Sequence, residues 1–167
     1  MSQSQQTPPA GTGKKITEQT IEVPENTIHE TVTEFEDYQV YELEKQNLAQ
    51  TGKVFYGETF SDVLSYNFPF SFPNVIKTAT TKARLDVAAI SSENTSFVLK
   101  LNDTQQQTVT VLKKSIDNYE VGKDANVVFT YTPSADNLIF NLSYTKATPV
   151  SRGYLNYLEV NARRSLT

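Results

Sequence analysis

The sequence contains no cysteine and no tryptophan, and it has a single histidine, His29. Without cysteine the chain can form no disulfide, no thiolate metal site and no cysteine nucleophile. With one histidine it cannot build a histidine-rich metal site, and a Ser-His catalytic pair would have to use His29. We interpret His29 as an exposed residue without a chemical role. The sequence therefore predicts no catalytic residue, no metal and no cofactor in this chain.

Long apolar runs are missing as well. No segment approaches the roughly 20 apolar residues that span a bilayer, and no apolar stretch of the signal-peptide kind follows Met1. We expect no membrane span, and if the natural protein is exported, its signal peptide is not in this chain.

Net positive charge is also absent. The 15 Lys and Arg residues are outnumbered by 19 Asp and Glu residues, and no basic stripe alternates with aromatic residues. Because nucleic-acid-binding proteins carry such a basic footprint, we expect no nucleic acid partner.

What the chain has in quantity is residues that suit strands. It contains 9 Tyr and 9 Phe, with many Val and Thr, and these side chains fit a pleated, half-buried surface. The length suits one domain. Residues 1–27 are rich in Gln, Ser, Thr and Pro and are predicted to be a flexible tail or linker. We expect residues 28–167 to form one β domain.

Alternating apolar and polar residues, separated by Pro, Gly, Asn, Asp and Ser, indicate strands throughout this domain. The predicted strands are 53–57, 64–70, 82–90, 96–101, 107–113, 126–131, 137–144 and 153–164. Hairpin turns are predicted around Asn102 and at 132–137. The fold class that follows is all-β: an antiparallel two-sheet β-sandwich of about eight or nine strands, of the jelly-roll or carbohydrate-binding-module kind.

One further segment, 38–43, admits two readings. Phe35, Tyr38 and Tyr41 recur every three residues, as in a helix, whereas Tyr38, Val40 and Glu42 would share one face of a strand. We favour the strand.

In two predicted strands the alternation assigns each residue to a face. In 82–90 one face holds Ala83, Leu85, Val87 and Ala89, and the other holds Lys82, Arg84, Asp86 and Ala88. In the last strand one face holds Tyr154, Asn156, Leu158, Val160 and Ala162, and the other holds Leu155, Tyr157, Glu159 and Asn161. The first pattern is typical of a half-buried antiparallel strand.

Two kinds of side chain are candidates for a site. Paired carboxylates would suit a glycosidase, and the candidates are Glu58, Asp62, Asp86 and Glu159. We interpret them as solvated surface groups. Exposed rings would suit glycan stacking, and the candidates are Tyr56, Tyr66, Tyr119, Tyr131 and Tyr144. Most tyrosines of a sandwich lie in its core or rim, which is the other reading of these five.

Two stretches resemble a known family. The first is "TGKVFYGETFS" (51–61) together with the "SYNFPFSFPNV" (65–75) that follows it, and the second is the closing "SRGYLNYLEVNARRSLT" (151–167). Together they resemble the β domain upstream of the peptidase in type IX secretion sortases, the PorU-like relatives of gingipain cysteine peptidases. The resemblance covers residues 38–167. The matching residues are Gly52, Tyr56, Gly57, Glu58, Phe60, Gly153, Tyr154, Leu155, Tyr157, Glu159, Asn161, Arg163 and Arg164.

The resemblance implies an exported protein at the outer membrane surface or in the periplasm of a Gram-negative bacterium of the Bacteroidetes type. In that family the full-length sortase removes the C-terminal signal domain of cargo proteins and attaches them to surface lipopolysaccharide. The family's catalytic Cys and His lie in a downstream peptidase domain, and neither has a counterpart in this chain. We therefore expect a non-catalytic accessory domain.

The partners implied are that peptidase domain, cargo or other secretion components. The matching residues would either hold the β domain together or line a contact with the peptidase domain. The alternative function is a secreted carbohydrate-binding or adhesin-like module, and a two-carboxylate glycosidase is a third reading.

Overall fold

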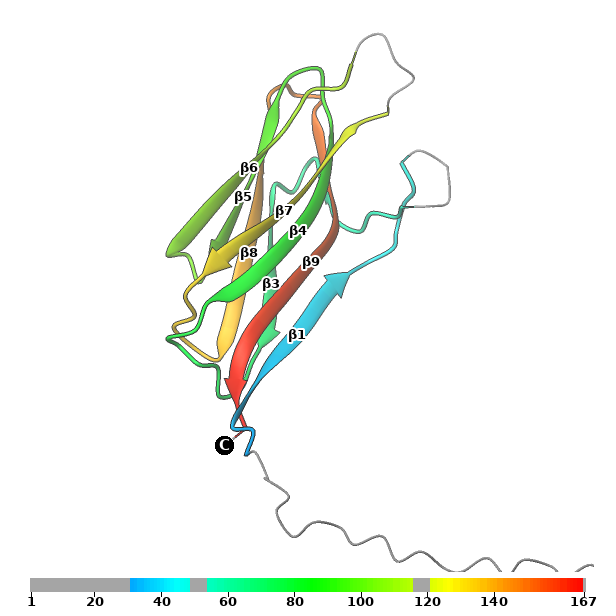
Figure 1. Cartoon of the computed structure of the whole chain (residues 1–167). Helices are drawn as coiled ribbons and strands as arrows, with labels where there is room; N and C mark the ends of the chain where they lie inside the picture. The colour runs from blue at the N-terminus through cyan, green and yellow to red at the C-terminus, as the bar shows by residue number, and fades with distance from the viewer. Residues whose placement is uncertain (1–30, 49–53, 116–120, 167) are drawn as a thin grey trace, which may run out of the picture. The chain divides into compact units, whose positions relative to one another are not determined.

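The computed structural model describes residues 31–48, 54–115 and 121–166 (Figure 1). The predicted tail 1–27 and the predicted start of the domain at residue 28 lie outside the described residues, as do His29, Gly52 and Tyr119. All regular secondary structure in the described residues is β: β1 (Glu34–Glu42), β2 (Thr59–Phe60), β3 (Ser65–Ser71), β4 (Thr81–Ile90), β5 (Thr95–Leu101), β6 (Gln105–Val111), β7 (Lys123–Tyr131), β8 (Asn137–Thr145) and β9 (Arg152–Ser165).

These strands form two layers. In the first, here the β9 sheet, the order is β1-β9-β4-β7, and the short β2 also pairs with β9. In the second, the β8 sheet, the order is β3-β8-β5-β6. The strand pairs are antiparallel. The predicted all-β, two-sheet antiparallel sandwich is confirmed.

Most strands lie where the sequence predicts them. The predicted segments from 64–70 onward correspond to β3 to β9. The strand reading of 38–43 is right, because Tyr38, Val40 and Glu42 lie on the exposed face of β1. The predicted strand 53–57 is wrong for the part described. Tyr56 forms only an isolated bridge with Gln46, and regular pairing starts later, at β2.

One of the two predicted hairpins is wrong. Asn102 and Asp103 have positive φ values of 46° and 59° and join β5 to β6 within one sheet, as predicted. Residues 132–137 instead connect β7 in the β9 sheet to β8 in the β8 sheet. The last residue of β7, Tyr131, meets β8 across the core, where its ring and that of Phe140 have centroids 5.4 Å apart.

The core lies between the two sheets. In β4 the predicted alternation is correct, since Ala83, Leu85, Val87 and Ala89 are all buried. The largest fully buried side chains come from both layers and include Phe60, Phe72, Phe97, Phe140, Leu99, Leu142 and Leu158. Burial of these side chains is the main favourable contribution to the fold.

A β-bulge in β9 changes the predicted faces of its first half. Asp86 pairs with Tyr157 and Val87 with Leu155, so Asn156 is an extra residue opposite one step of β4. Leu155 therefore faces the core, and Tyr154 lies on the other side of the sheet, opposite Ala88, where both are buried in a small second cluster with Tyr56. The strict alternation predicted for this strand is wrong before the bulge. After it, Leu158, Val160 and Ala162 are buried as predicted.

Candidate functional site

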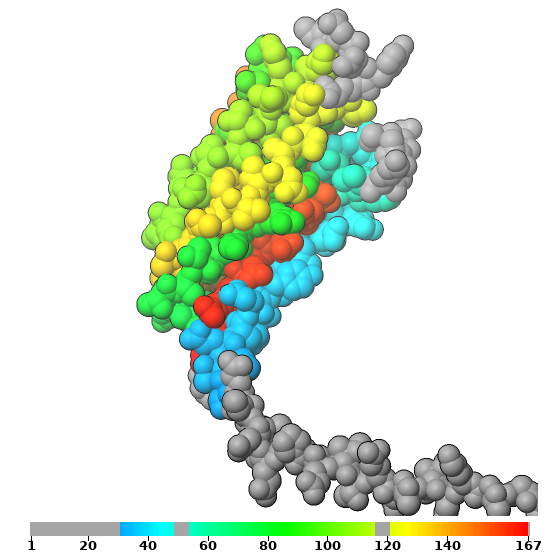
Figure 2. All heavy atoms as spheres, viewed as in Figure 1, coloured from blue at the N-terminus to red at the C-terminus, as the bar shows by residue number. Residues whose placement is uncertain are grey.

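The outward side chains of the β9 sheet form one broad face, with β7, β4, β9 and β1 running side by side (Figures 1 and 2). We call it the outer face. The strand register arranges its residues in rows: Tyr38-Asn161-Lys82-Thr130, Val40-Glu159-Arg84-Val128 and Glu42-Tyr157-Asp86-Asn126. Neighbours in a row are one strand spacing apart, about 4.8 Å. Residues remote in sequence thus become neighbours.

The opposite surface of the sandwich is chemically different. The outward strand residues of the β8 sheet are mainly Ser, Thr, Asn and Gln, and among those described Lys100 is the charged one. Charged side chains gather instead on the outer face of the β9 sheet. A ligand recognised by charge would meet the sandwich there.

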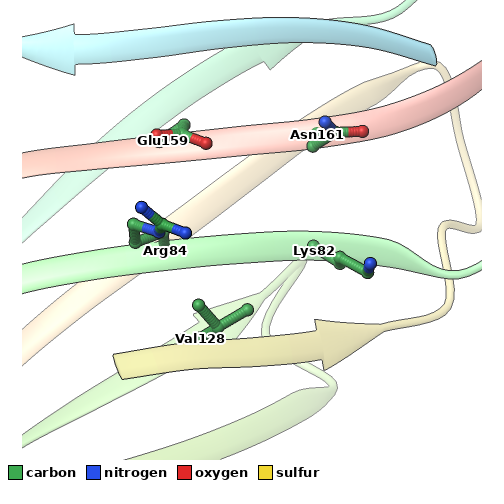
Figure 3. A pocket seen from close by; sticks show the side chains of 5 residues that line it. All are labelled: Lys82, Arg84, Val128, Glu159 and Asn161. Atoms are coloured by element: carbon green, nitrogen blue, oxygen red, sulfur yellow. The ribbon is translucent and has the colours of Figure 1, made fainter. Parts of the chain in front are cut away.

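A shallow hollow lies at the centre of the outer face (Figure 3). Its volume is about 150 Å³, and it is lined by Lys82, Arg84, Val128, Glu159 and Asn161. Arg84 lies between Glu159 and Val128, on the strand between theirs. Within the described part of the chain neither Lys82 nor Arg84 forms an ion pair or a hydrogen bond. Both cationic groups are therefore available to a ligand.

A polar network lies beside the bulge in the next row. Asn126 donates hydrogen bonds from Nδ2 to Asp86 Oδ2 at 2.6 Å and to Tyr157 Oη at 2.8 Å. Asn156, the extra residue of the bulge, donates to Asp86 Oδ1 at 3.3 Å. Both oxygens of Asp86 are thereby occupied within the protein. The network fixes the bulge rather than presenting a free acid or base.

The four candidate carboxylates do not line one hollow. Asp86 and Glu159 share the outer face as diagonal neighbours, but only Glu159 of the four lines the central hollow. Glu58 lies beside β2, and Asp62 is exposed in the loop after it. Among the hollows of the described residues, none is lined by two of the four, as the glycosidase reading requires.

The two stretches that carry the family resemblance lie against each other. Gly57 donates from its backbone N–H to the Leu155 carbonyl at 2.8 Å, and Leu155 donates back to the Glu58 carbonyl at 3.0 Å. The ladder continues with Thr59 opposite Tyr154 and Phe60 opposite Gly153. Segments almost a hundred residues apart thus form one antiparallel pairing.

Both glycines of this pairing fit where a side chain cannot. A Cβ at Gly57 would lie 2.5 Å from the Leu43 carbonyl oxygen, and a Cβ at Gly153 would lie 2.7 Å from Cζ of Phe97. Phe60 and Leu155 are buried in the core. These four residues of the two resembling stretches lie where they serve the structure.

The side chain of Glu58, unlike its backbone, contacts residues outside this pairing. Tyr41 donates its hydroxyl to Oε1 of Glu58 at 2.5 Å, and Lys45 Nζ lies 3.0 Å from Oε2. Burial acts to raise the pKa of Glu58, but the hydrogen bonds from Tyr41 and Lys45 and the charge of Lys45 outweigh it and lower the pKa below its usual value. Burial, with the bond to Glu58, raises the pKa of Tyr41 to about 12. The carboxylate is held ionised and the phenol neutral.

The two arginines near the C-terminus differ in their surroundings. Arg164 donates to Asp37 Oδ2 and to the Pro73 carbonyl, each at 2.6 Å, and its guanidinium lies 5.3 Å from the centre of the Phe35 ring. Arg163 is half exposed and pairs with Glu34 at 3.1 Å. The contacts of Arg164 hold neighbouring segments together, whereas Arg163 is an exposed surface group.

The tyrosines proposed for glycan stacking are mostly unavailable. Tyr131, Tyr144 and Tyr56 are buried, and the Tyr131 hydroxyl donates to the Leu99 carbonyl at 3.1 Å. Tyr66 is partly buried against the core and donates to the Thr59 carbonyl. Burial removes the open ring face that stacking needs, so this reading is wrong for Tyr56, Tyr131 and Tyr144, and the Tyr66 ring is only partly accessible.

The exposed ring of the outer face is Tyr38, which is 59% exposed. Neither Tyr38 nor the hollow residues Lys82, Arg84 and Val128 are among the site residues that the sequence predicts. The sequence feature that could have indicated this hollow is the pair of basic residues, Lys82 and Arg84, on the solvent face of one predicted strand. The strand order that places Tyr38 and Asn161 in their row is a long-range property.

The described ranges contain no helix long and apolar enough to cross a bilayer. No three His, Cys, Asp or Glu side chains of these ranges gather as metal ligands would.

No protein-family model and no curated protein matches the sequence. Among solved structures, the chain is similar to dimeric latent PorU from Porphyromonas gingivalis, with a TM-score of 0.66 and 17% identity. That match covers 81% of this chain and 13% of the PorU chain. The CBM36-1 domain of a multidomain xylanase from the hindgut metagenome of Trinervitermes trinervoides matches with a TM-score of 0.47 and 12% identity, over 74% of this chain and 96% of that one.

The PorU comparison bears on the fold. At 17% identity, it shows that this chain has the fold of a segment of PorU. The predicted resemblance to a PorU-like β domain is confirmed at that level. This chain spans 13% of the length of the PorU chain.

Proposed function

We propose that this chain is a non-catalytic interaction module of a cell-surface protein related to the type IX secretion sortases. The observation that carries the proposal is the fold shared with a segment of PorU, over 81% of this chain and 13% of that one. A sandwich that occupies such a share of a longer chain is one module among others. It would contribute binding and positioning, while peptidase chemistry would belong to another domain.

The chemistry of the described residues supports a binding role. The carboxylate of Asp86 is occupied by two amides, and that of Glu58 by Tyr41 and Lys45. Groups held in this way stabilise a fold but are poorly placed to transfer protons to a substrate. The sequence, moreover, contains no cysteine that could act as the family's nucleophile.

Arg163 is the best placed of the family-like residues to contact a neighbouring peptidase domain. Gly57, Phe60, Tyr154 and Leu155 are buried, whereas the Arg163 side chain is 51% exposed. An acidic patch on the partner would be complementary to it. Secretion components and cargo are other partners of the same kind.

Isothermal titration calorimetry of this chain with a purified peptidase region from a type IX sortase-like protein tests the proposal. We expect binding that Arg163→Glu weakens about tenfold, because reversing an interfacial charge replaces attraction by repulsion. Lys100→Glu on the β8 sheet is the matched control and should leave the affinity unchanged. Absence of binding, equal effects of the two variants, or peptidase activity of this chain alone would overturn the proposal.

A further inference from the structure

Two cations on the outer face have no partner in the described structure, although a carboxylate stands opposite one of them. Arg84 is paired in the register with Glu159, yet their charged atoms do not come within ion-pair distance. Lys82 lies two residues along the same strand and is exposed. Both cations therefore lie on one sheet face, and no described residue forms an ion pair with either of them.

The hollow around these cations continues toward β1. A second hollow, of about 280 Å³, is lined by Glu36, Thr80, Lys82 and Asn161, and it shares the last two residues with the first. The first hollow alone, at 150 Å³, has the volume of about five waters. Together they form an elongated depression that suits an extended ligand of more than one unit better than a lone inorganic anion.

An exposed aromatic ring borders this depression. Tyr38 follows Glu36 on the outward side of β1 and pairs in the register with Asn161. Tyr38 is 59% exposed, so its ring offers a flat apolar surface beside the polar groups. Val40 and Val128, 47% and 50% exposed, lie at the two ends of the next row. The polar centre is thus bordered by apolar surface.

The charges facing the depression specify the chemistry of its occupant. Lys82 and Arg84 supply two positive charges, whereas Glu159 and Glu36 supply two negative ones. Oε1 of Glu36 lies 3.9 Å from Nε of Arg163, so its charge is partly balanced. A polyanion would be repelled by Glu159 and, less strongly, by Glu36. A ligand with one carboxylate and many hydroxyls fits, because the cations can bind the carboxylate while Glu159 and Asn161 exchange hydrogen bonds with the hydroxyls.

From this arrangement we infer that the outer face binds an acidic saccharide, in which a uronate unit is linked to a neutral sugar. The uronate carboxylate lies against Lys82 and Arg84, and the neutral unit lies along the second hollow beside the Tyr38 ring. An acidic peptide fits less well, because it would have few hydroxyls to offer Glu159. The inference does not depend on the sortase-like role, since it needs only the described outer face.

The test is an NMR titration of the full chain with cellobiouronic acid, which carries one carboxylate, and with cellobiose, its neutral analogue. We expect cellobiouronic acid to bind with a dissociation constant on the order of 1 mM. Cellobiose should bind about tenfold more weakly, because it lacks the charge-assisted hydrogen bonds. The amide shifts should map to Tyr38, Lys82, Arg84 and Asn161, and the affinity should fall as the salt concentration rises to about 0.5 M.

Variants on the two surfaces provide the controls. Arg84→Gln should weaken cellobiouronic acid binding about tenfold while leaving cellobiose unaffected. Lys100→Gln, on the β8 sheet, should change neither. If Arg84→Gln fails to fold, Lys82→Gln makes the same comparison. Tyr38→Ala should weaken both sugars.

Four results would overturn the inference. The first two are that cellobiouronic acid does not bind, or that cellobiose binds with the same affinity. The other two are that the amide shifts are confined to the β8 sheet, or that the acidic peptide Gly-Glu-Gly binds as tightly as cellobiouronic acid. The last result would reassign the depression to a protein partner. None of them bears on the calorimetric test with the peptidase region, so the two proposals fail separately.

Discussion

Arg163 and Arg164 are adjacent and chemically identical, yet the structure predicts very different consequences when each is replaced by alanine. The Arg164 guanidinium joins β9 to β1 through Asp37 and to the loop after β3 through the Pro73 carbonyl. The Arg163 side chain, 51% exposed, makes its shorter ion-pair contact with Glu34, which is 44% exposed. Arg164→Ala removes hydrogen bonds that connect three segments, whereas Arg163→Ala removes a solvated ion pair.

The magnitudes follow from exposure and geometry. The Arg164–Asp37 pair has side chains only 22% and 25% exposed, and a hydrogen bond to a charged group contributes about 1.5–3 kcal/mol. Allowing for partial screening by solvent, we expect Arg164→Ala to lower the free energy of unfolding by about 2 kcal/mol. For Arg163→Ala we expect a loss within about 0.5 kcal/mol, because exposed pairs contribute little. Arg164→Lys should lie between them, since an ammonium lacks the planar fork that serves two acceptors.

Urea denaturation of the wild type and the three variants measures these differences at constant m-value. In a thermal melt, Arg164→Ala should lower Tm by about 6 °C and Arg163→Ala by less than about 2 °C. Equal losses for the two alanine variants would show that the contacts of Arg164 do not hold the strands together. The reasoning would also be wrong if Arg164→Lys were as stable as the wild type.

Three further predictions concern the pairing of β2 with β9 and the Tyr41–Glu58 contact beside it. Gly153→Ala should cost about 1–3 kcal/mol in urea denaturation through overpacking, because its Cβ would lie 2.7 Å from Phe97; a loss below about 0.5 kcal/mol would contradict the assigned contact. Glu58, with its lowered pKa, should contribute stability that is complete above pH 4.5, its ordinary pKa, and lost as the pH falls through the folded value. The Tm difference between wild type and Glu58→Gln should therefore shrink below pH 4.5, and a constant difference would refute the claim. At the alkaline end, the Tyr41 hydroxyl should contribute stability that is complete below pH 10 and lost as the pH rises to about 12, which a comparison with Tyr41→Phe detects.

The sequence predicts this fold well wherever the information is local. The faces of β4 and β1 follow from a period of two, and the Asn102 turn follows from residues that tolerate positive φ. One extra residue, Asn156, is enough to invert the assigned faces of Tyr154 and Leu155. A bulge leaves no clear mark in such a pattern, because both residues are apolar and suit either face.

The site was harder to predict than the fold for a related reason. The alternation within a strand's sequence predicts which of its residues point outward. The position of β9 between β1 and β4, however, depends on contacts between residues far apart in sequence. Only that order places Tyr38 in the row of Lys82. The burial of Tyr131 is equally non-local, since its hydroxyl reaches the backbone of Leu99, on a strand of the other sheet. From the sequence alone it cannot be predicted whether a tyrosine hydroxyl will be hydrogen-bonded to water or to a buried carbonyl.

The family-like residues and the hollow residues have largely separate tasks in this sandwich. Gly57, Gly153 and Leu155 are buried where β9 meets β2 and the segment before it, so these residues serve this pairing. Lys82 and Arg84 lie on the exterior of β4, outside both resembling stretches, and nothing in the core requires a positive charge there. A related domain can therefore keep the scaffold while replacing these two cations. What such a domain binds has to be read from the exterior of β4 rather than from the resemblance.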